Sequence, residues 1–151
     1  MRAGSDDALS EASHMESPRL KIMICDDEPR LCSAWERLLA SQKDMDFVGA
    51  FECADGLVEA IGTLAPSVVL MDLTMPGRDP IEVLLEASSQ HPDSRIIVYS
   101  GFSDAETIQK VIDAGAWGLV DKLQPPIEIL DAIRRVARGE ALLPSDPGNP
   151  R

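Results

Sequence analysis

Long apolar runs are missing from this 151-residue sequence. The longest run drawn only from Val, Ile, Leu, Met and Phe is VVLM, at positions 68–71. A membrane-spanning helix needs about 20 apolar residues, so we expect no membrane insertion. The amino-terminal region also lacks the apolar core of a secretory signal peptide, and nothing in the sequence indicates secretion.

Cysteine is scarce, with three residues at Cys25, Cys32 and Cys53. They form no C-x-x-C pair, and no histidines cluster with them, so neither a zinc site nor a disulfide framework is predicted. We expect reduced cysteines that act as small apolar side chains in a cytoplasmic protein.

Positive charge is also in short supply. The chain has 14 Lys and Arg against 26 Asp and Glu, a net charge of −12 at pH 7. Such a surface repels a phosphate backbone, so we expect no direct nucleic-acid binding by this chain. Apolar residues make up 44% and charged residues 26%, an ordinary composition for one globular domain of roughly 150 residues.

The two ends of the chain differ from its middle. Residues 1–18 have no sustained periodicity, and Ser13-His14-Met15 resembles a cloning scar, so a disordered leader or residues left by cloning are expected there. Residues 140–151 end in a segment with three prolines and a glycine and are expected to form a linker or tail. The folded domain is therefore predicted over residues 19–139.

Within that domain, short β-rich runs alternate with helical stretches. The runs cover residues 20–25, 47–51, 67–72, 95–100 and 118–120. The first, third and fourth are apolar at consecutive positions, which is typical of strands buried on both faces. The intervening stretches carry apolar residues three and four positions apart, as in Leu31, Trp35 and Leu38.

Strict strand–helix alternation predicts an α/β fold with helices on both faces of a parallel sheet. The commonest arrangement of five such units is flavodoxin-like, a doubly wound five-stranded parallel sheet of order 2-1-3-4-5 with five helices. Asp79 before Pro80 suits the start of a helix. Residues 103–106 (SDAE) form a candidate capping box, and Gly115 is a plausible helix stop.

Chemically active side chains follow four of the predicted strands. Asp26 and Asp27 follow the first strand, Asp72 ends the third, Ser100 ends the fourth, and Lys122 follows the fifth. The predicted strand order brings these ends to one rim. Each residue alone is explained by a cap, a turn or a solvated loop. Their occurrence together favours a functional site.

The chemistry of this set is specific. Three carboxylates at one rim repel one another unless a cation is present, and oxygen donors with open positions suit Mg²⁺. A metal held by Asp27 and Asp72 would attract a phosphoryl group, and Asp72 could then act as a nucleophile that forms an acyl phosphate. The Ser100 hydroxyl and the Lys122 ammonium could neutralise the remaining phosphoryl oxygens.

The segments ICDDE, MDLTMPGRDP, YSG and AGAWGLVDK, in this order and spacing, resemble a CheY-like receiver domain of response regulators over roughly residues 19–139. The resemblance implies that Asp72 accepts a phosphoryl group from a histidine kinase. It further implies that Asp27, Asp72 and the main-chain carbonyl of Thr74 bind Mg²⁺, with Asp26 acting through water. The chain would then catalyse only its own phosphorylation and dephosphorylation and would not be an enzyme in the usual sense.

Signalling is also implied by the resemblance. Ser100 would turn toward the phosphoryl group and Lys122 would pair with it, and the family uses its fourth helix, fifth strand and fifth helix for output or for a homodimer. Leu119 stands where the family usually has Tyr or Phe, which places an aromatic switch in doubt; neither Tyr99 nor Trp117 occupies that position.

Residues 137–144 (ARGEALLP) resemble receivers that precede a helix-turn-helix output domain, which implies transcription regulation through a domain absent from this chain. A stand-alone receiver acting on a partner protein is the alternative.

A Mg²⁺-dependent phosphatase is less well supported because D-x-D-x-T is absent. An FMN-binding flavodoxin would need Ser, Thr and Gly where Asp26-Asp27-Glu28 stands.

Overall fold

The computed structural model describes residues 18–101 and 104–144. Most of the expected leader, residue 103 and the end of the expected tail lie outside the described residues. No helix within the two described ranges is long and apolar enough to cross a bilayer. In these ranges five strands and five helices alternate: β1 (Leu20–Cys25), α2 (Pro29–Ala40), β2 (Met45–Phe51), α3 (Leu57–Leu64), β3 (Val68–Met71), α4 (Pro80–Gln90), β4 (Arg95–Ser100), α5 (Ala105–Asp113), β5 (Gly118–Asp121) and α6 (Pro126–Ala137).

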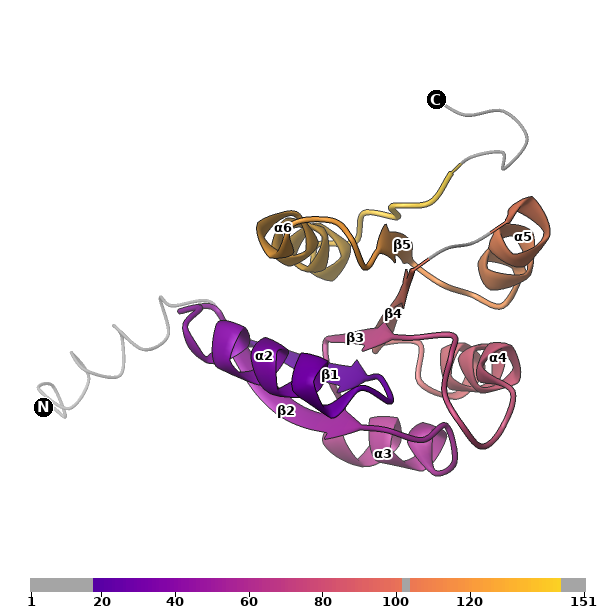
Figure 1. The fold of residues 1–151 in the computed structure, drawn as a ribbon, viewed down its shortest axis with the longest axis horizontal. Coiled ribbons are helices and arrows are strands. Elements are labelled where there is room, and N and C mark those ends of the chain that lie inside the picture. Colours follow the sequence, from indigo (N-terminus) through magenta and orange to yellow (C-terminus); the bar gives the residue numbers. More distant parts are fainter. Residues whose placement is uncertain (1–17, 102–103, 145–151) are drawn as a thin grey trace, which may run out of the picture.

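The five strands form one parallel sheet of order β2-β1-β3-β4-β5 (Figure 1). This order and the flavodoxin-like fold confirm the prediction. The bounds of β1 and β4 are also as predicted, whereas β2 begins two residues early, at Met45, which pairs with Leu20 and is fully buried. The early start follows from that pairing, which the apolar pattern of β2 alone does not indicate.

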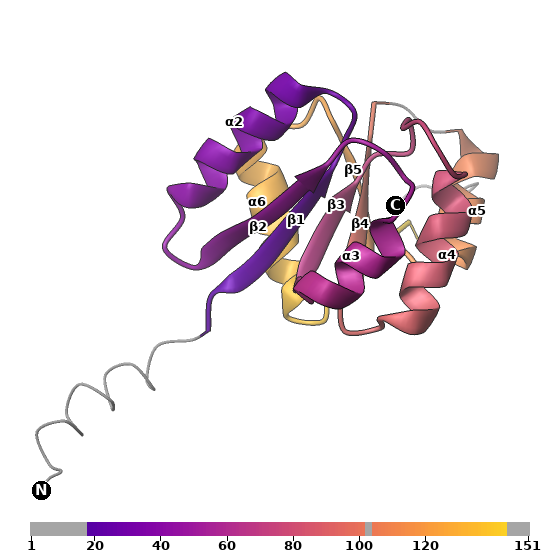
Figure 2. The same cartoon turned by 90° about the horizontal axis from the view of Figure 1, so that it is seen from below.

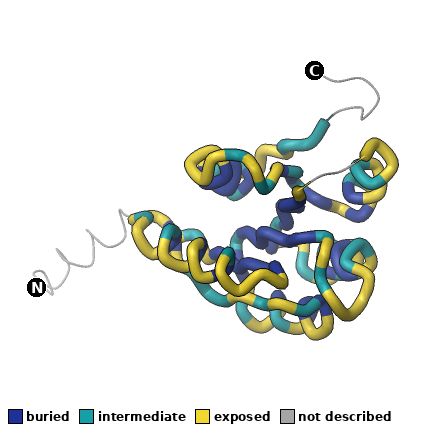
Figure 3. Tube along the Cα trace, viewed as in Figure 1, coloured by how far each residue is buried: buried dark blue, intermediate teal, exposed yellow. Residues whose placement is uncertain are grey.

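Two apolar cores lie on opposite faces of the sheet. Helices α2 and α6 cover one face, and α3, α4 and α5 cover the other (Figure 2). Ile22 and Ile24 of β1 face the first core, and Met23 and Cys25 face the second. Because successive side chains of a strand point to opposite faces, burial on both sides requires the continuous apolar runs seen in the sequence. The central strands β1, β3 and β4 accordingly form the buried centre of the tube in Figure 3.

Helix ends are set by local hydrogen bonds. Asp79 caps α4 by accepting a hydrogen bond from Ile81 N at 3.0 Å, with Pro80 in the first turn, as predicted. The predicted capping box at residues 103–106 is wrong, because Asp104 is the N-cap of α5 and accepts from Thr107 N at 2.7 Å. The Asp104 carboxylate thus accepts from the third N–H of the helix, and the cap lies one position later than predicted. Gly115 ends α5 with φ of 104°, as expected.

The segment after α6 returns to the edge of the sheet. Leu142 forms a parallel bridge with Gly118, donating from its N to Trp117 O at 2.8 Å and accepting from Leu119 N at 3.2 Å. The next residue, Leu143, packs against the second core. These contacts cover the outer edge of β5 with the start of the predicted linker, which protects an otherwise unpaired strand edge.

Candidate functional site

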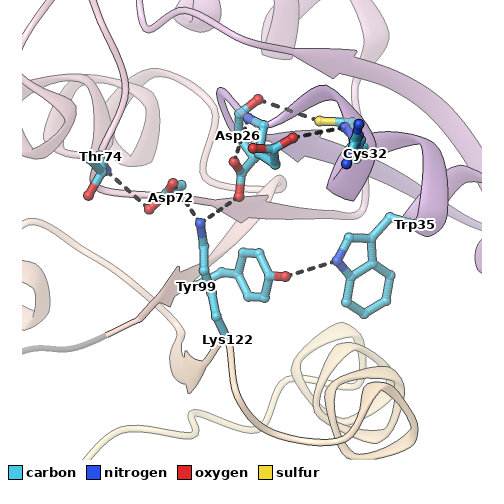
Figure 4. A network of polar contacts seen from close by, with 9 residues as sticks. Asp26, Cys32, Trp35, Asp72, Thr74, Tyr99 and Lys122 are labelled. Carbon is cyan, nitrogen blue, oxygen red and sulfur yellow. Dashed lines mark hydrogen bonds and ion pairs between the residues drawn. The ribbon is translucent and has the colours of Figure 1, made fainter.

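Asp26, Asp72 and Lys122, which follow three of the strands, lie together at the carboxyl edge of the sheet (Figure 4). Asp26, Asp27 and Asp72 each offer an oxygen within 4.8 Å of the others. Lys122 reaches this cluster from the far side of β4, and its main-chain N donates to Ser100 O at 2.9 Å. The parallel order of β1, β3, β4 and β5 therefore brings the predicted residues to one place.

The Lys122 ammonium is shared by two buried carboxylates. Its Nζ lies 2.9 Å from Asp72 Oδ2 and 2.8 Å from Asp26 Oδ2. Partial burial of the ammonium disfavours its charge, but the contacts and charges of the two carboxylates outweigh this effect, so the pKa of Lys122 lies above its ordinary value. The lysine stays protonated and holds both carboxylates in place.

Each buried carboxylate is also fixed by its own turn. Asp72 Oδ1 accepts a hydrogen bond from Thr74 N at 3.1 Å, and Asp26 Oδ1 accepts one from Glu28 N at 2.9 Å. Both bonds join a side chain to the main-chain N–H two residues later, as in an Asx turn. The simpler role of turn formation is therefore real for both residues. It leaves the Oδ2 atoms directed at the lysine.

The donor set fits a hard divalent cation. Three carboxylates facing one ammonium leave two negative charges, which one divalent ion balances. Asp26 Oδ2 is buried, and its partner among the described residues is the Lys122 ammonium, 2.8 Å away, so it keeps a lone pair for a further contact. Asp27 is exposed, which leaves the cluster open to solvent on one side. Oxygen donors with room for water are the ligands that Mg²⁺ prefers.

An aromatic pair that the sequence analysis did not assign to the site lies beside the lysine. Lys122 Nζ is 5.3 Å from the centroid of the Tyr99 ring, and Trp35 Nε1 donates to the Tyr99 hydroxyl at 3.1 Å (Figure 4). The two rings meet edge to face, with centroids 6.1 Å apart. In the sequence, the position of Tyr99 directly before Ser100 could have indicated that Tyr99 lies near the site. Neighbouring residues of a strand point to opposite faces, so Tyr99 lies on the face of β4 opposite Ser100.

Cysteine takes no chemical part in this site. All three cysteines are free, and Cys25 and Cys32 are buried. Burial raises the pKa of both thiols, so they remain protonated and unreactive. Cys32 Sγ donates weakly to Asp26 O at 3.4 Å. Cys25 and Cys32 therefore serve as apolar packing residues, as expected.

We predict that Lys122→Met lowers the free energy of unfolding by about 2–4 kcal/mol at neutral pH, because it leaves two buried carboxylates without a cation. The control is Lys110→Met, which removes an exposed ion pair to Glu106 and should cost less than about 1 kcal/mol. Urea unfolding of the three proteins measures both effects. Equal losses for the two variants would contradict the prediction.

The pH dependence of this loss has a defined sign. A group whose pKa is raised in the folded protein contributes stability that is fully present below its unfolded pKa, about 10.4 for lysine. That contribution disappears as the pH rises through the folded pKa. The gap between wild type and Lys122→Met should therefore be constant between about pH 6 and 9 and should shrink only at more alkaline pH.

Transcriptional regulatory proteins are among the known proteins that are similar to this chain. The chain is 34% identical over 128 residues to the transcriptional regulatory protein LiaR of Bacillus subtilis (strain 168), which covers 83% of this chain and 60% of LiaR. The chain thus spans about 60% of the length of this curated relative.

Solved structures agree with this likeness. A two-component response regulator of the LuxR family from Aurantimonas sp. SI85-9A1 superposes with a TM-score of 0.76 at 26% identity, covering 83% of this chain and 89% of that one. The isolated REC domain of RcsB from Salmonella enterica serovar Typhimurium, solved with the phosphomimetic BeF3⁻, gives a TM-score of 0.74 at 25% identity and covers 84% of this chain and 94% of that one.

The match extends to the family as a whole. The profile of the response regulator receiver domain covers residues 22–134. This range includes every described strand and helix except the first two residues of β1 and the last three of α6. It also includes every residue of the acidic cluster and its lysine. The chain belongs to the response regulator receiver domain family.

Proposed function

We propose that this receiver takes a phosphoryl group onto Asp72 from the phosphohistidine of a histidine kinase, with Mg²⁺ bound beside it. The observation that carries the proposal is the buried Asp72 carboxylate, held between the Lys122 ammonium and two further carboxylates. A nucleophilic carboxylate needs a fixed orientation and nearby positive charge to meet a phosphoryl group.

The transfer is a displacement at phosphorus. A carboxylate oxygen of Asp72 forms the new O–P bond while the N–P bond of the phosphohistidine breaks, and the leaving imidazole takes a proton from solvent. Lys122 can follow the developing negative charge because its ammonium already contacts Asp72 Oδ2 at 2.9 Å. We assign the Ser100 hydroxyl, at the end of the neighbouring strand, to a further phosphoryl oxygen.

The metal would be held by Asp27, Asp72 and the main-chain carbonyl of Thr74, with Asp26 acting through water. When bound, Mg²⁺ supplies charge neutralisation for the carboxylates and for the phosphoryl oxygens. The chain's own residues do the rest: Thr74 N and Lys122 orient the Asp72 carboxylate, and the partly exposed rim admits the donor.

The wider role rests on the relatives. LiaR is named a transcriptional regulatory protein, and this chain spans only part of its length. We propose that the receiver regulates transcription through a DNA-binding output domain, and that this acidic chain does not itself touch DNA. A stand-alone receiver acting on a partner protein is the alternative, which the full-length gene would decide. Free cysteines are consistent with a cytoplasmic location.

We predict that Mg²⁺ raises the melting temperature of the wild type, because a cation that relieves carboxylate repulsion binds only the folded state. At ten times its Kd the gain is about 1.4 kcal/mol. Asp27→Ala should remove most of this response, and Asp26→Ala should remove less. The control Asp93→Ala changes an exposed aspartate at the other end of the sheet and should respond as wild type does. An undiminished response in Asp27→Ala would show that the ion binds elsewhere.

We predict that acetyl phosphate with Mg²⁺ adds one hydroxylamine-sensitive phosphoryl group to the wild type, as measured by intact mass. Asp72→Asn and Asp72→Ala should remain unlabelled while keeping the fold. Asp121→Asn replaces another carboxylate at the same edge, which is exposed and bonded only within its own loop, and should label normally. Stoichiometric labelling of Asp72→Ala would overturn the proposed function.

Output is proposed on the face formed by α5, β5 and α6, the fourth helix, fifth strand and fifth helix of the family, and a homodimer would use the same face. With beryllofluoride bound, hydrogen exchange should change more over residues 100–120 than over residues 55–64, because Ser100 ends β4 and Lys122 follows β5, the strand paired with β4. Ser100→Ala should weaken this response without blocking phosphorylation. Changes confined to α3 would contradict this route. Sedimentation velocity with beryllofluoride tests the homodimer.

A further inference from the structure

Tyr99 contacts the lysine of the site and the helix α2 at the same time. The ring is 2% exposed and lies on the α2 and α6 side of β4, where it belongs to the first core. One side of the ring faces Lys122 Nζ, and the hydroxyl accepts the Trp35 hydrogen bond across a separation of 64 residues. Figure 4 shows the chain of contacts running from Asp72 through Lys122 and Tyr99 to Trp35.

The Tyr99 ring is a third contact of the Lys122 ammonium, in addition to the two carboxylates. Two carboxylates attract Lys122 from the acidic side, but its long stem has several rotatable bonds and a quarter of the side chain is exposed. An aromatic face attracts a cation and, unlike water, cannot move with it. The edge-to-face packing on Trp35 and the hydrogen bond that Trp35 Nε1 donates to the Tyr99 hydroxyl prevent the ring from turning away. Burial raises the pKa of the Tyr99 hydroxyl, so the acceptor remains neutral.

The neighbouring strand offers no equivalent contact. Leu119 of β5 is partly buried against the second core, on the opposite face of the sheet, and its side chain has neither a ring nor a polar atom. Among the described residues, Tyr99 is the aromatic side chain in contact with the Lys122 ammonium, and it lies on the α2 side of the sheet.

We infer that Tyr99 is a positioning residue: its ring holds the Lys122 ammonium ready for the phosphoryl group, and its hydroxyl links that position to Trp35 in α2. The inference rests on the proposed function, because Lys122 is taken to pair with the phosphoryl group. Preorganisation lowers the cost of ordering a flexible side chain when the ligand arrives. It follows that occupancy of the phosphorylation site changes the surroundings of Trp35.

The first test measures the affinity for beryllofluoride at saturating Mg²⁺. Tyr99→Leu removes the ring and should weaken binding about three- to tenfold, whereas Tyr99→Phe keeps the ring and should bind within about twofold of wild type. Ile97→Ala is the matched control, because Ile97 is buried on the same face of the same strand and belongs to the same core. It should lose stability but keep its affinity.

Two results of this test would overturn the inference alone: wild-type affinity in Tyr99→Leu, or an equal loss in Ile97→Ala. A wild type that neither binds beryllofluoride nor accepts a phosphoryl group would overturn the proposed function, and the inference with it. Circular dichroism establishes that each variant is folded before its affinity is compared.

The second test needs only conservative substitutions and decides the matter even when Tyr99→Leu does not fold. In a Trp117→Phe background, Trp35 is the remaining tryptophan, and beryllofluoride should change its fluorescence emission. Adding Tyr99→Phe removes the acceptor of the Trp35 hydrogen bond and should reduce this change by about half or more. An emission change of the same size with and without the Tyr99 hydroxyl would overturn the link to α2.

Discussion

The arrangement of this receiver depends on one ammonium placed between two buried carboxylates. Asp26 is 0% and Asp72 2% exposed, and neither charge could be kept from water without a cation close by. Lys122 supplies it at 2.8 Å and 2.9 Å. The chain's own lysine thus holds the acidic cluster together, and the cluster keeps negative charge that a divalent cation can balance.

The sheet, rather than the loops, determines where these groups lie. Asp26 N donates to Phe51 O, Asp72 N to Cys25 O and Lys122 N to Ser100 O, so the main chain of each site residue continues the hydrogen bonding of a strand pair. A shift of one residue in any of these pairs would turn the side chain to the other face. Because both faces are packed with apolar residues, such a shift would also disrupt a core. Core packing and site geometry are therefore specified together.

Much of this could be read from the sequence because it depends on local patterns. Continuous apolar runs predicted β1 and β4 to the residue, and the motifs at the strand ends predicted which side chains would meet. Predictions were wrong or absent where two local solutions compete or where distant segments meet. The cap of α5 is Asp104, one position after the predicted one, because its carboxylate accepts from Thr107 N, and the start of β2 depended on its pairing with β1. The contact between Tyr99 and Trp35 joins a strand to a helix from another part of the chain, and no periodicity encodes that distance.

The existing contacts of Lys122 also limit the conformational effect that the proposed phosphorylation of Asp72 would have. A ligand shifts a conformational equilibrium only by the difference between its interactions with the two states. Because Lys122 already has two carboxylate partners, the proposed pairing with a phosphoryl group would replace strong contacts and add less than a new ion pair. The remaining difference must come from groups that change neighbours when the ammonium moves. On the α5 side Leu119 has only hydrocarbon to offer, whereas on the α2 side Tyr99 has both a ring face and a hydrogen-bonded hydroxyl. In this receiver the polar consequences of moving the lysine therefore fall on the face of the sheet opposite Leu119.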